Sequence, residues 1–348
     1  MSNAGPIGVG PVLQVHPSRR CNLACGHCYS SSGPQVQGEL PRELLHAALK
    51  DAAALGYEQL AVSGGEPFLY DGLPGLLGRA RRLDFVTSVT TNGMLLGQAR
   101  RWEPVAPLID ALAISIDGTE EEHDLMRRRD GAFAQTVKNL QVVRDSGIPF
   151  GFLFTLTQYN ASSLEFVVRL AASEGARSVQ VHPLTLTGRA ATMLQGDRPD
   201  AIELTAAIVE GRRLGEELGV TVHVDAVTQD QLTLYRGAFV PQFPTRDITD
   251  VAPVLIIESD GTVRPLTHEI PDHLAVGSLT HGRLTTLSRA WLRGPAAREL
   301  AGAAERTWWD LVDPAAGPAS YWYDEVAARI APPLAPAAPV ALPMLEVA

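Results

Sequence analysis

Short apolar, β-branched runs alternate with helical stretches from residue 12 to residue 183, and this alternation constrains the fold more than any other feature. Strands are expected at residues 12–16, 59–62, 85–90, 111–116, 150–157 and 178–182. Strands that alternate with helices pair in parallel through crossover connections. Six such units are too few to close an eight-unit barrel. The sequence therefore predicts an α/β fold, namely a partial, open (β/α)6 barrel of the TIM type.

The pattern changes in the second half of the chain. Residues 201–218 are typical of one long helix, 254–265 of a hairpin with Ser259, Asp260 and Gly261 at its turn, and 284–292 of a short helix. The last residues are rich in proline and alanine. We expect an N-terminal arm (1–11), the partial barrel (12–195), a small α+β extension (196–330) and a Pro/Ala-rich tail (331–348).

Charge and hydropathy exclude several classes of partner. The formal net charge is −10, which disfavours a broad surface for nucleic acid. No apolar run reaches the ~18 residues that a membrane span requires. The first residues are small and neutral and do not resemble a secretory signal. A cytoplasmic location is expected.

All three cysteines of the chain fall within eight residues, as Cys21-x-x-x-Cys25-x-x-Cys28, just after the first expected strand. Thiolates are the usual ligands of iron–sulfur clusters, and a cubane commonly takes four of them. Three thiolates would leave one iron open to chelate S-adenosylmethionine (SAM), whose reductive cleavage gives a 5′-deoxyadenosyl radical that removes hydrogen from a substrate. The alternative is a structural zinc knuckle with His27 or His16 as its fourth ligand.

Polar turns follow the next strands. Ser63-Gly64-Gly65-Glu66-Pro67 follows the second strand. Its glycines allow close approach to a ligand, and Glu66 adds a carboxylate, so the turn suits the ammonium group of SAM; alone, it also reads as a plain turn. Arg127 suits a carboxylate as a planar fork, or else belongs to a solvated charged face with its neighbours Arg128 and Arg129.

In their order, these motifs resemble those of the radical SAM superfamily across residues 12–190. Cys28-Tyr29, Ser115-Ile-Asp-Gly118, His123-Asp-x-x-Arg127 and Gly188-Arg189 point to the branch with a C-terminal SPASM or twitch extension. Those enzymes often modify ribosomally made peptides; others act on sulfatases, redox-cofactor precursors or tetrapyrroles. The resemblance implies one 4Fe–4S cluster on Cys21, Cys25 and Cys28, and a flavodoxin- or ferredoxin-type electron donor. It also implies SAM contacts from Tyr29, Gly64, Gly65, Glu66, Asn92, Ser115, Arg127, Thr157 and Asn160.

The chain departs from that family after Pro265. Leu266 stands where a cysteine is usual, and no cysteine follows Cys28, so we expect a lid without auxiliary clusters. The missing cysteines disfavour peptide epimerisation and thioether formation, and no cobalamin module is recognised.

Three hypotheses about function remain. The first is a maturase that forms a carbon–carbon or related cross-link in a precursor peptide. The second is a small-molecule dehydrogenase or rearrangement enzyme; no leader-binding segment is recognised before residue 12, which keeps the two close. The third is a zinc-binding or inactive scaffold. No catalytic residue is assigned, and the candidate substrate contacts are Asp117, His182, Glu258, His268 and Glu269.

Overall fold

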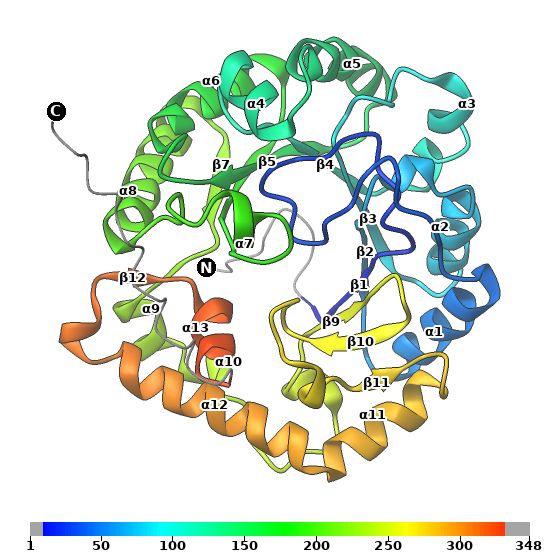
Figure 1. Cartoon of the computed structure of the whole chain (residues 1–348), viewed down its shortest axis with the longest axis vertical. Coiled ribbons are helices and arrows are strands. Elements are labelled where there is room, and N and C mark those ends of the chain that lie inside the picture. The colour runs from blue at the N-terminus through cyan, green and yellow to red at the C-terminus, as the bar shows by residue number, and fades with distance from the viewer. Residues whose placement is uncertain (1–9, 331–348) are drawn as a thin grey trace, which may run out of the picture.

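The computed structural model describes residues 10–330, which are built around a ten-stranded sheet (Figure 1). The strand order is β11-β10-β9-β1-β2-β3-β4-β5-β6-β7, so β7 and β11 form two separate edges. The six expected strands are present and pair in parallel: β1 (Val12–Val15), β2 (Gln59–Val62), β3 (Val86–Thr91), β4 (Ala111–Ser115), β5 (Phe150–Leu156) and β6 (Ser178–Pro183). The predicted open, TIM-like barrel is confirmed.

The C-terminal half of the chain extends the sheet at both edges. β7 (Thr221–Val224) pairs in parallel with β6. On the other side β9 (Val254–Ile257) pairs in parallel with β1, and β10 (Thr262–Pro265) folds back on it as the expected hairpin, followed by β11 (Gly277–Ser278). The sheet therefore continues across residue 195, where the sequence suggests that the barrel ends.

Helices cover the outside of the barrel and the C-terminal segment (Figure 1). Those between the strands are α1 (Arg42–Ala54), α2 (Leu73–Arg81), α3 (Ala99–Trp102), α4 (Glu120–Arg127), α5 (Ala132–Ser146), α6 (Leu164–Glu174), α7 (Ala190–Met193) and α8 (Ala201–Leu218). The C-terminal segment adds α9 (Gln229–Leu234), α10 (Arg236–Phe239), α11 (Leu284–Arg293), α12 (Pro295–Leu311) and α13 (Trp322–Ala328), with the short pair β8 (Val227–Thr228) and β12 (Ala319–Ser320). Asp200 is the N-cap of α8, and its carboxylate accepts hydrogen bonds from the first backbone amides in a capping box with Glu203.

Alternation along the strands separates a packed outer layer from a hollow interior. Successive side chains of a strand point to opposite faces. In β5 the outward residues Phe154 and Leu156 are fully buried under helices, whereas inward positions here and in neighbouring strands carry small or polar residues such as Gly151, Ala113 and Ser88. Closed TIM barrels fill this space with bulky branched side chains. Here the small residues leave a cavity of about 1430 Å³.

Helix length and polarity also show whether a helix could cross a membrane. Among the helices of residues 10–330, none combines the length and apolar composition that a bilayer crossing requires. Apart from residues 10 and 11, the expected arm (1–11) and tail (331–348) lie outside the described residues.

Candidate active site

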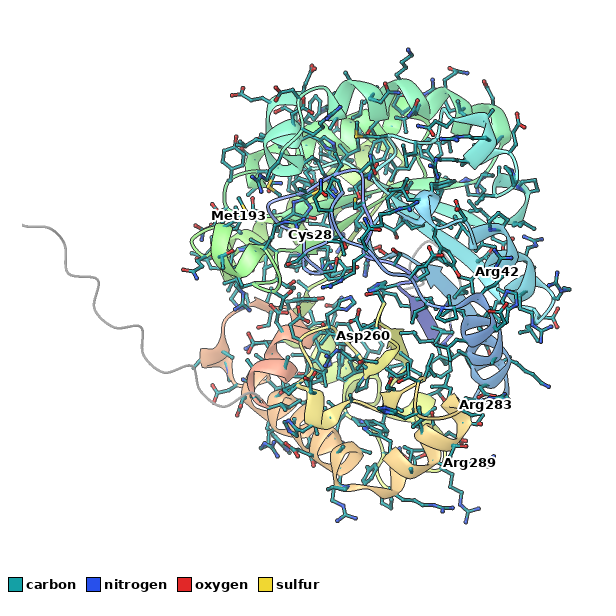
Figure 2. The ribbon with its side chains drawn as sticks, turned by 45° about the vertical axis from the view of Figure 1, so that its right-hand side comes forward. Cys28, Arg42, Met193, Asp260, Arg283 and Arg289 are labelled. Atoms are coloured by element: carbon teal, nitrogen blue, oxygen red, sulfur yellow. The ribbon has the colours of Figure 1, made fainter. Side chains whose placement is uncertain are left out.

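The three cysteines lie together on the loop that follows β1, at the carboxyl ends of the parallel strands. Cys21 and Cys25 are buried, Cys28 is half-buried, all three thiols are free, and all three line the cavity. Figure 2 shows Cys28 toward the centre of the molecule, whereas Arg42, Arg283 and Arg289 lie at its periphery. Three convergent thiols that face a cavity fit an iron–sulfur cluster with one open iron.

Nitrogen–hydrogen donors surround the cysteine sulfurs. The backbone amide of Leu23 lies 3.4 Å from the Cys21 Sγ, and that of Ser32 lies 3.3 Å from the Cys28 Sγ. Burial raises the pKa of the Cys21 thiol to about 12, with Glu66 adding to the effect. The thiol is therefore neutral in the metal-free chain, and a bound metal would take up the charge of the thiolate.

Arg189, in the loop between β6 and α7, holds the cysteine loop. Its Nε donates to the Cys25 carbonyl at 2.8 Å, its Nη2 to the Ser32 carbonyl at 2.6 Å, and its backbone amide to the Cys28 carbonyl at 3.0 Å. At Gly188 a side chain would overlap the Tyr29 carbonyl. Sequence reasoning used Gly188-Arg189 only for the resemblance and missed this positioning role. The available signal was a Gly-Arg pair in the loop that follows β6.

The turn after β2 crosses directly behind the cysteine loop. The amide of Gly65 donates to the Ser18 carbonyl at 2.9 Å, and that of Glu66 donates to the Arg20 carbonyl at 2.9 Å. A Cβ on Gly65 would overlap the Arg20 carbonyl, so the glycine is required for this approach. Gly64 and Gly65 line the cavity. The segment is therefore more than a plain turn, because its backbone bonds to the cysteine loop and lines the cavity.

Glu66 lies behind the cavity wall, where it holds the turn after β3. Its Oε1 accepts hydrogen bonds from the Thr91 hydroxyl at 2.8 Å and the Phe68 amide at 3.2 Å. Its Oε2 accepts one from the Asn92 amide at 2.9 Å. Burial raises the pKa of the Glu66 carboxyl, while these donors favour its charged form. The carboxylate is thus occupied by the protein, and its predicted contact with SAM stays a prediction.

The other predicted SAM contacts fall into two groups. Tyr29, Asn92, Ser115 and Arg127 line the cavity together with the cysteines. Thr157 and Asn160 are fully buried: the Thr157 hydroxyl donates to the Asn160 Oδ1 at 2.9 Å, and the Asn160 side chain donates to the Asp117 carbonyl at 3.0 Å. This second pair joins the ends of β4 and β5 from behind.

Arg127 is buried beside the cysteines, so the alternative of a solvated charged face is wrong for this residue. Its side chain is 8% exposed and its Nε lies 2.7 Å from the Oδ2 of Asp117, which is fully buried. Its Nη1 lies 3.9 Å from the Cys25 Sγ. Burial disfavours ionisation of Asp117, but Arg127 outweighs it and holds the pKa of this carboxyl below its usual value.

Both histidines considered as a fourth zinc ligand are directed at carboxylates. The Nε2 of His27 lies 3.8 Å from the Asp117 Oδ2, and the Nδ1 of His16 lies 3.1 Å from the Glu258 Oε2. The zinc-knuckle alternative therefore lacks the support of a histidine turned toward the thiols.

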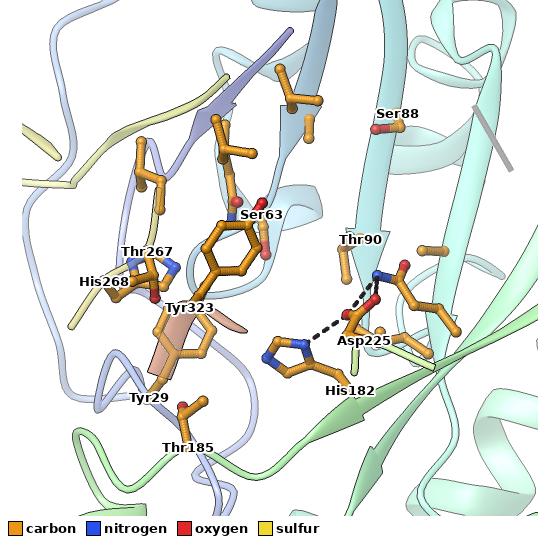
Figure 3. Close-up of a pocket in the computed structure, with 18 of the residues that line it drawn as sticks. Tyr29, Ser63, Ser88, Thr90, His182, Thr185, Asp225, Thr267, His268 and Tyr323 are labelled. Carbon is orange, nitrogen blue, oxygen red and sulfur yellow. Dashed lines mark hydrogen bonds and ion pairs between the residues drawn. The ribbon is translucent and has the colours of Figure 1, made fainter. Parts of the chain in front are cut away.

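A second polar cluster lines the cavity at the ends of β6 and β7 (Figure 3). The His182 Nδ1 lies 2.9 Å from the Asp225 Oδ2, and Gln180 donates to the same oxygen at 2.9 Å. Burial opposes a charge on His182, but the hydrogen bond to Asp225 raises its pKa above the usual value. Of the predicted substrate contacts, His182, His268 and Glu269 line the cavity. Sequence reasoning missed Asp225, which a His-x-Asp pattern at a strand end marks.

Asp324 on α13 predicts a pH dependence of stability. Its side chain is 10% exposed, with its Oδ2 3.1 Å from the Arg198 Nη2. Burial, with Glu269 nearby, raises its pKa to about 7. In the unfolded chain an aspartate has a pKa of about 3.9. The free energy of unfolding should therefore fall as the pH rises from about 4 toward 7, because the unfolded chain releases this proton more readily than the folded protein does. Asp324→Asn, which stays neutral, should raise the free energy of unfolding by about 2–4 kcal/mol at pH 8.

Urea unfolding of both proteins between pH 4 and 8 measures this effect. The gain should shrink to nothing near pH 4. Asp310→Asn, in an exposed pair with Arg329, is the matched control and should show no such trend. A constant difference between Asp324→Asn and the parent at all pH values would rule out the buried carboxyl as the cause.

Comparison with known sequences adds the family. Residues 15–171 match the Radical SAM superfamily. This segment is a radical SAM domain. The domain contains the cysteine loop, the turns after β2 and β3, and Arg127. Enzymes of this superfamily use a 4Fe–4S cluster and SAM, so the expected cofactors are confirmed at the level of the family.

Individual relatives differ in how much of the chain they match. A pre-heme d1 synthase of Dinoroseobacter shibae is 35% identical over 182 residues, 51% of this chain and 45% of that protein. A PqqA peptide cyclase of Ruegeria pomeroyi is 29% identical over 80% of this chain and 73% of that protein. The structure of anSMEcpe with AdoMet and the Kp18Cys peptide shares the fold, with a TM-score of 0.64, 18% identity, and coverage of 92% and 97%. The chain spans about half the length of the first curated relatives it matches.

Proposed function

We propose that this chain is a radical SAM enzyme that cleaves SAM reductively and abstracts hydrogen from a precursor peptide, forming a carbon–carbon or related cross-link. The observation that carries the proposal is the gathering of Cys21, Cys25 and Cys28 at one wall of a deep cavity within a radical SAM domain. A 4Fe–4S cluster held by the three thiolates would supply an open iron for SAM and the electron that splits it into methionine and a 5′-deoxyadenosyl radical. Each cross-link removes two hydrogens from the peptide: one would go to this radical, and the other would leave as a proton and an electron that returns to the cluster.

The residues around the cysteines would bind and orient SAM. Gly64 and Gly65 present backbone at the cavity wall, where carbonyl groups suit an ammonium group. Arg127 keeps a positive charge 3.9 Å from the Cys25 Sγ, which favours the thiolate and attracts a carboxylate. Asn92 and Ser115 add polar groups on the same wall. Glu66, Thr157 and Asn160 would act one layer behind, as positioning residues.

The size of the cavity supports a substrate that enters the barrel. Sites for drug-sized ligands measure ≈ 300–1,000 Å³, and this cavity measures about 1430 Å³. Room for a peptide segment therefore remains after SAM binds. The walls of the lumen would also limit the contact of a carbon radical with water and side reactions.

Peptide modification is supported by the PqqA peptide cyclase, whose similarity extends over 80% of the chain. The proposal includes a flavodoxin- or ferredoxin-type electron donor, and a reducing cytoplasm, where thiols and clusters persist. A small-molecule substrate is the second candidate. The similarity of the pre-heme d1 synthase over 51% of the chain favours it.

Anaerobic reconstitution tests the proposal. The protein should take up about four irons per chain and release 5′-deoxyadenosine when reduced with SAM. Co-expression with a short peptide encoded by a neighbouring gene should then lower the peptide's mass by two hydrogens for each cross-link. Formation of 5′-deoxyadenosine with no change in the peptide would favour the small-molecule candidate. Bound zinc without 5′-deoxyadenosine would reject both.

A further inference from the structure

Three side chains of metal-ligating type meet outside the cysteine loop. His16 directly follows β1, Glu258 directly follows β9, and His268 lies just beyond β10. One ligating atom of each lies within 4.8 Å of those of the other two. We propose that His16, Glu258 and His268 bind a divalent transition-metal ion, at the seam between the radical SAM domain and the C-terminal hairpin. This proposal is independent of the proposed function.

The two imidazoles converge on one carboxylate. The Nδ1 of His16 lies 3.1 Å from the Glu258 Oε2, and the Nδ1 of His268 lies 2.7 Å from the Glu258 Oε1. The two rings stack with centroids 4.8 Å apart at 24°. Protonation of both rings would bring two positive charges face to face. One divalent ion instead binds both neutral Nδ1 atoms and offsets the charge of the carboxylate.

The donor set indicates the class of metal. Two imidazole nitrogens and one carboxylate oxygen form catalytic zinc sites and the facial triad of non-haem iron, with further positions open. Bond lengths of about 2.0–2.2 Å hold ligand atoms about 3–4 Å apart, so the farthest pair must close by about 1 Å. His16 is fixed at 1% exposure, whereas Glu258 and His268 are 20% and 19% exposed and have room to adjust.

The surroundings of His16 suit a ligand. Its second ring nitrogen, Nε2, lies 3.3 Å from the Tyr29 hydroxyl and 2.8 Å from the Gln14 side-chain amide. A ligating histidine commonly donates its other N–H to an acceptor that fixes the ring. The Tyr29 hydroxyl oxygen accepts in its present position, and the Gln14 amide accepts after its oxygen and nitrogen exchange places.

The positive charge of Arg264, near Glu258, is largely balanced by another carboxylate. The Nε of Arg264 lies 4.0 Å from the Glu258 Oε1, but its Nη2 pairs with Asp272 at 2.6 Å. Glu258 therefore remains available to a cation.

The position of the site gives it a consequence for the fold. His16 and Glu258 are 242 residues apart in sequence, so a bound ion would clamp the C-terminal hairpin onto the strand that leads into the cysteine loop. His268 lines the cavity and stacks on Tyr29, with ring centroids 4.4 Å apart (Figure 3). A metal ion at this site would thus lie beside the cavity.

Metal analysis of the full-length protein, with its cluster reconstituted, tests this site. After equilibration with Zn²⁺ and removal of the excess, we expect about one zinc per chain in addition to the cluster iron. Loss of an outer-shell partner alone weakens binding 10–100-fold, so Glu258→Gln should raise the Kd for Zn²⁺ by more than about 100-fold. Glu299→Gln, in the exposed pair with His273 at 3.2 Å, is the matched control and should leave the Kd unchanged.

Two further measurements keep the result decisive. Co²⁺ at the site should give the absorption of a nitrogen and oxygen ligand set, without thiolate charge transfer. Zn²⁺ should raise the Tm of the parent but not of His268→Gln, which serves if Glu258→Gln does not fold. The proposal is overturned if Zn²⁺ does not bind, if thiolate charge transfer dominates with Co²⁺, or if the Kd is the same in Glu258→Gln and the parent.

Discussion

Replacing Cys25 by alanine is expected to abolish 5′-deoxyadenosine formation, lowering its rate on the order of 10³-fold or more, as loss of an essential group does. The chain has three cysteines in all, so no other thiol is available to take the place of Cys25. Two thiolates would leave a second iron exposed and the cluster prone to loss. Iron content and 5′-deoxyadenosine should therefore fall together.

A control in the same loop separates loss of the ligand from damage to the loop. Ala24→Ser changes a half-buried neighbour of Cys25 and leaves every thiol in place. It should keep the iron content and the 5′-deoxyadenosine yield of the parent, measured anaerobically by iron analysis and chromatography. If Cys25→Ala still formed 5′-deoxyadenosine at the rate of Ala24→Ser, the assignment of Cys25 as a ligand would be refuted.

The cysteine loop and the barrel were predictable because their signals are local. The three cysteines lie within eight residues, and each strand is read from a few neighbouring residues. Five of the six expected strands shift by one residue at one or both ends, and β2 matches at both ends. Such short-range patterns can be read from the spacing of apolar residues along the sequence.

The roles that sequence reasoning missed depend on contacts between distant segments. Arg189 reaches the Cys25 carbonyl across 164 residues, and Glu66 is occupied by donors from the turn after β3. The hairpin of β9 and β10 was expected, but its parallel pairing with β1 was not, because β9 joins the sheet on the far side of β1 from β2. No local period encodes such partners.

Asp117→Asn is expected to lower the free energy of unfolding by about 3–5 kcal/mol, because it leaves a buried cation without its partner. Asp117 is fully buried, so water cannot take the place of its carboxylate, and the Arg127 side chain, at 8% exposed, keeps little contact with water on its cavity side. Asparagine can still accept the Thr155 amide that now donates to the Asp117 Oδ1 at 3.2 Å. The loss should therefore come from charge rather than from shape. Urea unfolding of the metal-free proteins measures it.

Glu216→Gln is the control. Glu216 pairs with Arg212, and the side chains of Glu216 and Arg212 are 71% and 81% exposed. This variant should change the free energy of unfolding by less than about 1 kcal/mol. Arg127→Met should also destabilise, and the double variant with Asp117→Asn should lose less than the sum, because neither charge remains. A sum that is strictly additive would contradict the ion pair.

The two single variants should also differ at the cofactor. Asp117→Asn keeps the positive charge of Arg127, whose Nη1 lies 3.9 Å from the Cys25 Sγ. Arg127→Met removes that charge from the cysteine loop. Iron uptake on reconstitution should therefore be retained in Asp117→Asn, at temperatures where it stays folded, and reduced in Arg127→Met. Equal iron uptake in both would mean that Arg127 serves the fold alone.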